Sequence, residues 1–165
     1  MNIKPSLYIE STIPSYLTAR PSNNLTNQYR QFLTKKWWDT MHDDFSLYTS
    51  DYTIDECKEG HPDAAQRRLE FLKGITRIQT TKDVETLAIK YIKLLSIPDR
   101  SKLDAFHLAI CVVNQIDYLL SWNCTHLGAF AGTAIAVYNE KNGLFVPILT
   151  SPETFIEVGG IDDET

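Results

Sequence analysis

The stretch LYIESTIPSYL, residues 7–17, sets a strand-like apolar run directly before a carboxylate and the start of a helix. Residues 7–9 have the aliphatic and aromatic side chains that favour a buried strand. Pro14 stands where the first turn of a helix tolerates proline, so we expect a short helix to begin just before it. A buried strand that ends on Glu10 would deliver a charged side chain to one edge of a sheet.

Strand-like and helix-like segments alternate along the rest of the chain. Apolar or alternating runs predict strands at 45–50, 76–81, 117–123 and 145–151. Helical spacing and end signals predict helices at 24–42, 53–60, 61–74, 82–98, 101–115, 132–143 and 151–158. The helix that contains DAFHLAI is apolar nearly all round, which predicts a position deep in the protein. Pro147 predicts an edge position for the last strand. The alternation favours a parallel sheet covered by helices on both faces.

Length and composition are those of one soluble globular domain. The chain has 165 residues, of which 43% are hydrophobic and 22% are charged. We expect a single domain over 1–158 and a disordered tail at 159–165. The N-terminus lacks the apolar run of a signal peptide, and no apolar stretch is long enough to span a bilayer, so we expect a cytoplasmic protein without a membrane partner. Its cysteines, Cys57, Cys111 and Cys124, lack zinc-type spacing and are interpreted as buried thiols.

The net charge of −5 argues against a basic surface that coats nucleic acid without regard to sequence. It leaves room for a local basic groove around an acidic centre that binds a metal ion.

Four polar side chains fall where strands end or helices begin. Glu10 ends the first strand, and Asn123 follows the strand within DYLLSWN. Glu56 lies in the helix after the FSLYTS strand, and Asp104 lies in the first turn of the most apolar helix. Ligands of open α/β sheets bind outside the carboxyl ends of the strands, so these side chains are candidates for one site.

Three carboxylates in one crevice would repel each other, and a divalent cation removes that repulsion. Mg²⁺ and Mn²⁺ prefer such oxygen ligands. Each residue also has an ordinary explanation: a strand-end charge for Glu10, a solvated helix residue for Glu56, an acid at a helix N-terminus for Asp104, and a loop or cap residue for Asn123. Only their joint placement predicts a metal site.

Four stretches, LYIESTIPSYL, DYTIDECKEG, DAFHLAI and DYLLSWNCTHL, resemble in this order those of the PIN-domain nucleases, and of their VapC-like toxin branch in particular. The resemblance spans roughly residues 7–155. It implies a three-layer α/β/α sandwich around a mainly parallel sheet, and cleavage of RNA that depends on Mg²⁺ or Mn²⁺ and leaves a 5′-phosphate and a 3′-hydroxyl. It also implies a bacterial type II toxin, an antitoxin that covers the acidic cleft, and a homodimer.

The resemblance assigns the acidic site position by position. Its acidic positions fall on Glu10, Glu56, Asp104 and Asn123, and its neighbouring hydroxyls on Thr12 and Ser121. By this assignment Glu10, Asp104 and Asn123 hold the metal, and Glu56 positions or deprotonates the attacking water. Glu10 stands where aspartate is usual, and Asn123 brings no charge. We therefore expect one metal to bind adequately and a second only weakly.

RNA needs cations near such a site. Candidates are Arg20, Arg30, Lys35, Lys36, Arg100 and Lys102. Of these, Arg20, Arg100 and Lys102 are our expected RNA contacts, the last two because they flank Asp104 in sequence; a solvated charged face is the alternative. Trp37 or Trp38 could stack on bases or lie in the core.

His107 follows Asp104 by three residues, and it could approach the site or be a core histidine with both nitrogens bonded.

Two other functions stay open. One is a catalytically weakened PIN-like module that binds RNA or protein, which Glu10 and Asn123 favour. The other is a Rossmann-like enzyme for small phosphorylated molecules, although the chain has neither GxGxxG nor GxxxxGK[ST]. The apolar stripe in NLTNQYRQFLTKKWW could serve a homodimer or an antitoxin.

Overall fold

The computed structural model describes residues 3–123 and 131–159. Helices and strands follow in the order β1 (Ser6–Ile9), α1 (Thr12–Thr18), α2 (Leu25–Met41), η1 (His42–Asp44), β2 (Ser46–Ser50), α3 (Asp51–Cys57), α4 (Pro62–Leu72), β3 (Thr76–Ile78), α5 (Lys82–Leu95), η2 (Asp99–Ser101), α6 (Lys102–Val113), β4 (Tyr118–Leu120), α7 (Ala131–Lys141), β5 (Ile148–Thr150) and α8 (Pro152–Gly159). The expected alternation of strands and helices is confirmed. The tail expected at 159–165 lies outside the described residues, except that Gly159 ends α8.

The strands form a parallel five-stranded sheet in the order β3-β2-β1-β4-β5. The parallel sheet predicted from the alternation is confirmed. β5 is an edge strand, as predicted from Pro147, which directly precedes it. β1 lies at the centre, with a parallel neighbour on each edge, and its residues Leu7 to Ile9 are all apolar because they are buried on both faces of the sheet.

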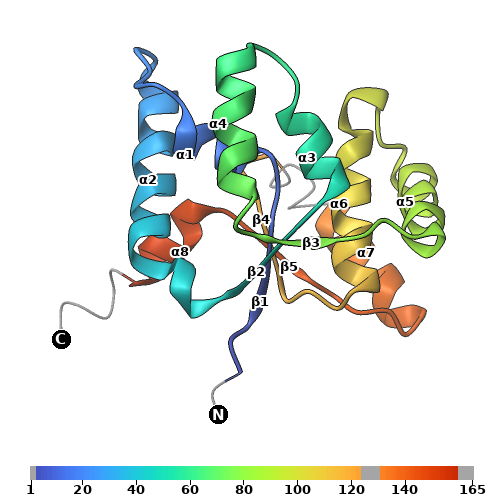
Figure 1. The fold of residues 1–165 in the computed structure, drawn as a ribbon. Coiled ribbons are helices and arrows are strands. Elements are labelled where there is room, and N and C mark those ends of the chain that lie inside the picture. Colours follow the sequence, from blue (N-terminus) through green and yellow to red (C-terminus); the bar gives the residue numbers. More distant parts are fainter. Residues whose placement is uncertain (1–2, 124–130, 160–165) are drawn as a thin grey trace.

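Helices cover both faces of the sheet, as Figure 1 shows. The side chains of β1 alternate between the two faces. Tyr8 packs into a core formed mainly with α5, α6 and α7, whereas Leu7 and Ile9 pack into a second core with α1, α2 and α8. The architecture is therefore the three-layer α/β/α sandwich that the resemblance implied.

The order of the strands reverses at β1. The chain proceeds from β1 outward to β3 on one side and then places β4 and β5 on the other side. In open α/β sheets such a switch point leaves a crevice at the carboxyl ends of the two strands beside it. Glu10 follows β1 there, and Ser121 follows β4. The main-chain N–H of Glu10 donates to the carbonyl of Leu120 at 3.3 Å, which joins the two strand ends.

The most apolar helix, α6, lies deep in the protein only over its middle. Its residues from Ala105 to Val112 are buried apart from the half-buried Phe106. Leu103 and Val113, at the two ends, are 42% and 39% exposed, so the expectation of burial was wrong for them. Apolar composition does not mark where a helix leaves the core. No helix in the described part of the chain is both long and apolar enough to cross a membrane.

Candidate active site

Glu10 is buried in a cradle of hydrogen-bond donors. Its side chain is only 2% exposed. Oε1 accepts hydrogen bonds from the Ser11 hydroxyl at 2.7 Å and the Thr12 main-chain N–H at 2.9 Å. Oε2 accepts from the Thr12 hydroxyl at 2.7 Å and from the Ser121 hydroxyl. A carboxylate offers about four lone-pair sites, so the cradle uses its full accepting capacity.

The cradle joins the first turn of α1 to the segment after β4. Thr12 accepts from the main-chain N–H of Trp122 at 2.9 Å, and Ser121 accepts from the main-chain N–H of Asn123 at 2.9 Å. A buried carboxylate without partners costs several kcal/mol, about as much as a few hydrogen bonds to a charged group can offset. The local sequence Glu-Ser-Thr supplies three of the four donors, and the sheet brings the fourth from β4.

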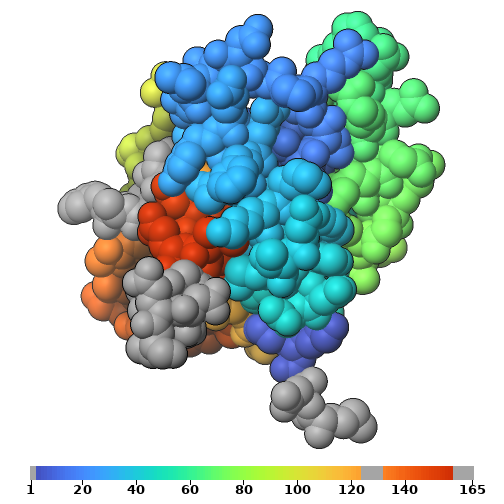
Figure 2. All heavy atoms as spheres, turned by 90° about the vertical axis from the view of Figure 1, so that its left-hand side faces the viewer, coloured from blue at the N-terminus to red at the C-terminus, as the bar shows by residue number. Residues whose placement is uncertain are grey.

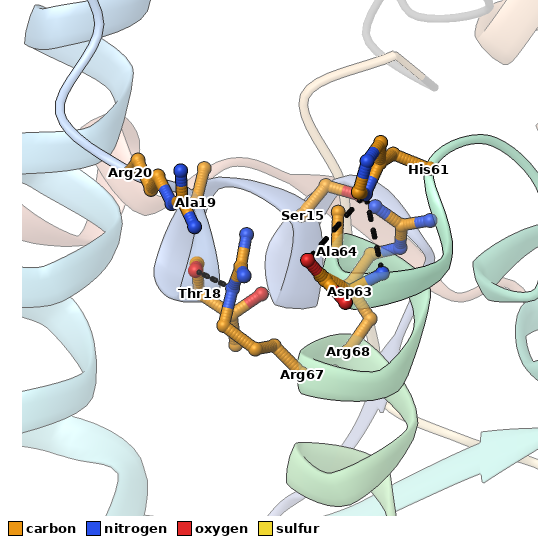
Figure 3. A pocket seen from close by; sticks show the side chains of 9 residues that line it. All are labelled: Ser15, Thr18, Ala19, Arg20, His61, Asp63, Ala64, Arg67 and Arg68. Carbon is orange, nitrogen blue, oxygen red and sulfur yellow. Dashed lines mark hydrogen bonds and ion pairs between the residues drawn. The ribbon is translucent and has the colours of Figure 1, made fainter.

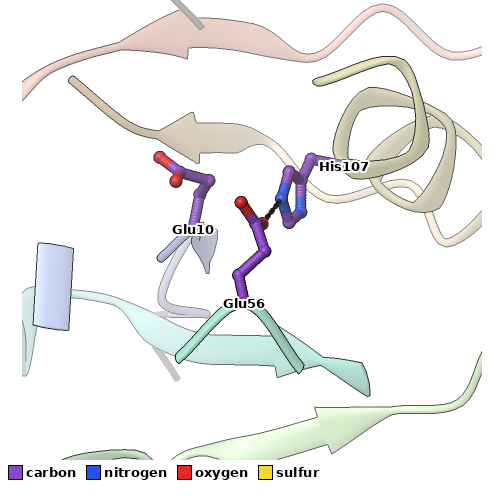
Figure 4. A group of neighbouring side chains, drawn as sticks. All are labelled: Glu10, Glu56 and His107. Atoms are coloured by element: carbon purple, nitrogen blue, oxygen red, sulfur yellow. Dashed lines mark hydrogen bonds and ion pairs between the residues drawn. The ribbon is translucent and has the colours of Figure 1, made fainter. Parts of the chain in front are cut away.

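Glu56 reaches the same end of the sheet from α3, as Figure 4 shows. Its Oε1 lies 2.5 Å from Nε2 of His107, a side chain on α6 that is 1% exposed. Glu56 itself is 29% exposed, so solvent reaches it. Nδ1 of His107 lies 2.7 Å from the hydroxyl of Tyr8, which in turn lies 2.6 Å from the hydroxyl of Ser50. A chain of hydrogen bonds thus leads from the central strand to a solvent-accessible carboxylate.

Burial and the neighbouring acids determine the protonation states of His107 and Tyr8 in this series of hydrogen bonds. Burial lowers the pKa of His107, but the hydrogen bond that His107 donates to Glu56 and the charges of Glu10, Glu56 and Asp104 outweigh it, and the net shift is upward. Burial raises the pKa of Tyr8 well above its usual value, so its phenol stays protonated. A protonated His107 donates from both ring nitrogens, to Glu56 and to Tyr8.

The donor atoms present fit a divalent cation. One ligand atom each from Glu10, Glu56 and His107 lie within 4.8 Å of one another. Carboxylate oxygens are the donors that Mg²⁺ and Mn²⁺ prefer, and His107 could supply a nitrogen only after it loses the proton that it donates to Glu56. The set also brings two negative charges into a largely buried place, which a cation would balance.

The other two predicted site residues, Asp104 and Asn123, are more exposed than Glu10. Asp104 is half-buried in the first turn of α6, one turn before His107, and its charge contributes to the raised pKa of that histidine. It is not part of the group within 4.8 Å. Asn123 is exposed just beyond β4. The structure therefore brings Glu10 and Glu56 together with His107, leaves Asp104 outside that group, and leaves Asn123 exposed.

The three expected RNA contacts have different surroundings. Arg20 is exposed and lines a pocket between α1 and α4. Arg100 is exposed in η2. Lys102 forms an ion pair with Asp99 at 2.6 Å, and this pair lowers the pKa of Asp99. The charge of Lys102 is thus already partly balanced.

The aromatic candidates are engaged in packing. Trp37 is fully buried in the core, so it is not a surface for bases. Trp38 is half-buried and stacks on His42 with ring centroids 4.3 Å apart. Arg30, another candidate cation, lies over the ring of Trp122 at 5.3 Å.

His107 is the residue whose part in the site could not be decided from the sequence. Both explanations of it hold, because it is buried with both nitrogens bonded and it also contacts Glu56. The one available signal was its position three residues after Asp104, which places both residues on one side of a helix.

Comparison with known proteins gives a likeness of fold. No protein-family model and no curated protein matches the chain. Among solved structures, VapC20 of Mycobacterium tuberculosis, a toxin that cleaves the sarcin–ricin loop, matches 74% of this chain and 95% of its own, with a TM-score of 0.59 and 15% identity.

A second match is a chain of VapBC2 from Rickettsia felis, solved with a DNA fragment from the promoter of that pair. It covers 88% of this chain and 97% of its own, with a TM-score of 0.55 and 12% identity. The chain therefore has the PIN-like α/β/α fold of these VapC structures.

Proposed function

We propose that the protein is a metal-dependent endoribonuclease that hydrolyses RNA phosphodiester bonds in the bacterial cytoplasm, as the toxin of a type II toxin–antitoxin pair. The fold it shares with VapC20 supports this proposal. The observation that carries it is the meeting of Glu10 and Glu56 at the switch point of the sheet, one buried and one open to solvent. Fold alone does not imply chemistry, and this pair supplies the acidic site that the chemistry needs.

The proposed cofactor is Mg²⁺ or Mn²⁺, with Glu10, Asp104 and Asn123 as the residues that would hold it. Glu10 is the most buried of these, and the more exposed Asp104 and Asn123 would act through water molecules, which Mg²⁺ commonly retains. When bound, the cation would stabilise charge that develops on the phosphate and lower the pKa of a water molecule.

Glu56 is the proposed base of the reaction. Oε1 is engaged by His107, which leaves Oε2 of a partly exposed carboxylate for the attacking water. His107, fixed by Tyr8, holds Glu56 in one orientation. A base that does not have to be ordered during the reaction removes an entropic cost from the barrier.

Cleavage assays with one substitution test this proposal. We expect purified protein to cut unstructured RNA with Mn²⁺ or Mg²⁺ and not with EDTA. Asp104→Asn should lower the rate by about a hundredfold or more, because it removes a charge at the cation site, while the melting temperature stays near that of the unchanged protein. An unchanged rate in a folded Asp104→Asn protein would reject the assignment of Asp104.

A catalytically weakened binding module is the second candidate, and the cradle favours it. All four accepting positions of Glu10 are already used by the protein itself, so a metal ion must compete with internal donors. Titration calorimetry with MnCl₂ separates the two functions. Heat of binding at micromolar to low-millimolar Mn²⁺ supports the nuclease, and no binding at millimolar Mn²⁺ supports the module.

The proposed partners, an antitoxin and a second copy of the chain, need an exposed apolar surface, and α2 has one. Leu25, Tyr29 and Phe32 are 79%, 50% and 63% exposed and lie on one side of the helix. Figure 2 shows α2 and α8 beside each other on this face, and the hydroxyl of Tyr29 donates to Glu153 of α8 at 2.8 Å. Light scattering of the purified chain, and of Phe32→Asp, tests whether this face forms the dimer.

A further inference from the structure

A basic pocket of about 380 Å³ lies between α1 and α4 (Figure 3). Arg20 lines it from the segment that follows α1, and Arg67 and Arg68 line it from α4. His61, the residue before α4, and Asp63, in its first turn, complete the charged or ionisable lining. We call it the arginine pocket. Its three guanidinium groups face one carboxylate, in a chain whose net charge is −5.

The three arginines of the arginine pocket carry more positive charge than the one carboxylate that lines it can balance. Within residues 3–123 and 131–159, none of its three arginines forms an ion pair. The carboxylate of Asp63 lies 4.0 Å from Nδ1 of His61. Glu70, which borders the adjoining hollow, is paired with Lys73 at 2.6 Å. An uncompensated cluster of arginines attracts anions.

Two of the guanidinium groups are held in place and keep donors to spare. Nε of Arg67 donates to the carbonyl of Thr18 at 3.0 Å. Nε of Arg68 donates to the carbonyl of Cys57 at 3.1 Å, and its terminal nitrogen donates to the carbonyl of Glu59. Each guanidinium has five N–H donors, so both retain several for a ligand. The side chain of Arg20 makes no hydrogen bond to the described residues, so all of its donors are available.

Both walls of the arginine pocket are connected to the acidic site, α1 through Thr12 and α4 through the bond from Arg68 to the end of α3. α1 begins at Thr12, which binds Glu10, and ends at Thr18, which lines the pocket. The helix has seven residues and is therefore about 10 Å long. Arg68 binds the carbonyl of Cys57, the residue after Glu56. An RNA strand bound at the acidic site would thus have a basic surface within about the length of α1, roughly 10 Å.

We propose that the arginine pocket binds phosphate groups of the RNA strand whose scissile bond lies at the acidic site, an inference that rests on the proposed nuclease function. Guanidinium groups with free donors match phosphate oxygens in a bidentate geometry. The N-terminus of α4, which opens onto the pocket, adds its partial positive charge. Contacts of this kind position the strand and do not read its sequence.

Binding measured without cleavage tests the proposal. The probe is a fluorescein-labelled 12-nucleotide oligouridine in EDTA, titrated by fluorescence anisotropy at several salt concentrations. Arg20→Gln should weaken binding roughly tenfold and reduce the magnitude of the slope of log K against log [salt] by about 0.7, the value for one lost phosphate contact on a single strand. The melting temperature should not change, because the side chain of Arg20 makes no hydrogen bond to the residues that the structure describes.

Lys93→Gln is the matched control. It removes one positive charge from the exposed surface of α5, on the opposite face of the sheet from α1. We expect its affinity for oligouridine to stay within about twofold of the unchanged protein, because exposed charges farther apart than a Debye length are largely screened.

The outcomes separate this inference from the proposed function. Three results would overturn the arginine pocket as an RNA site: equal effects of Arg20→Gln and Lys93→Gln on affinity, no binding of oligouridine in EDTA, or an unchanged affinity of Arg20→Gln. An unchanged affinity of Arg20→Gln would point to an acidic protein partner instead. Cleavage with Mn²⁺ is scored separately. Arg20→Gln should keep the single-turnover rate at saturating protein and need a higher concentration for half-saturation, whereas failure of the proposed function would show as no cleavage by any variant.

Discussion

The two carboxylates of the acidic site are held in opposite ways. Glu10 is buried and receives four hydrogen bonds, three of them from the two residues that follow it in the chain. Glu56 is partly exposed and is held through a single histidine whose own support comes from the central strand. The difference indicates a division of labour. A residue that holds a cation must be immobile, and a residue that exchanges protons with water must be reachable.

The cradle should be the more costly of the two to break. Glu10→Gln replaces one acceptor oxygen by an amide that donates, so two of the four donors lose their partner inside the protein. We expect a loss of about 2–4 kcal/mol in the free energy of unfolding, and loss of Mn²⁺ binding by calorimetry. Urea denaturation in EDTA measures the first effect without any contribution from metal.

Glu140→Gln is the control for this prediction, since Glu140 is an exposed glutamate on α7. It should change the unfolding free energy by less than about 0.5 kcal/mol. A Glu10→Gln protein as stable as this control would show that the cradle is not an energetic unit.

Loss of the hydrogen bonds through His107 should lower the unfolding free energy less than loss of the cradle does, but it should affect the reaction more selectively. His107→Gln keeps a polar side chain in place of the imidazole and removes the bonded connection between Glu56 and Tyr8. We expect a loss of about 1–3 kcal/mol in unfolding free energy and a large fall in the cleavage rate with Mn²⁺ binding retained. Parallel calorimetry and single-turnover cleavage give the two readings. Loss of Mn²⁺ binding in a folded His107→Gln protein would instead identify His107 as a ligand of the cation.

The two carboxylates also differ in how well their positions could be predicted from the sequence. The position of Glu10 was predictable, because an apolar run that ends on an acid and meets Pro14 defines a strand end and a helix start, and a parallel sheet puts such ends at one edge. Thr12 is in contact with Glu10 for the same local reason. The parallel sheet and the edge position of β5 likewise followed from local patterns.

Contacts between distant helices were not predictable. Glu56 and His107 meet because α3 and α6 pack together, and the two residues are 51 positions apart in the chain. Periodicity indicates that His107 is buried but not what it faces. The role of Arg67 and Arg68 could not be predicted either, because the pattern at 61–74 indicates a helix but not what its arginines face. Sequence proximity also misled in part: Lys102 lies two residues from Asp104, yet it pairs with Asp99.

The smallest expected effect concerns Cys57, which directly follows Glu56 and ends α3. The side chain is 1% exposed, and burial raises the pKa of its thiol to about 12. Only the thiolate reacts with iodoacetamide, so Cys57 of the folded protein should be alkylated at pH 8 far more slowly than a free cysteine. Because the pKa is raised, the thiol stays protonated as the pH passes the ordinary value near 9, and its contribution to stability is lost only as the pH rises above that value.

Alkylation of Cys57 therefore reports whether α3 keeps its place when its carboxylate is released. If His107 orders only the side chain of Glu56, the rate of labelling in His107→Gln, measured by peptide mass spectrometry at pH 8 in EDTA, should stay within about threefold of the rate expected from its loss of global stability. If His107 anchors α3 itself, local opening will expose the thiol, and labelling will accelerate by tenfold or more beyond what the loss of global stability measured by urea denaturation accounts for. Arg68 supports the first result, because its bond to the carbonyl of Cys57 holds the end of α3 independently of His107. Fast labelling in His107→Gln would mean that Glu56 and the helix that carries it move together.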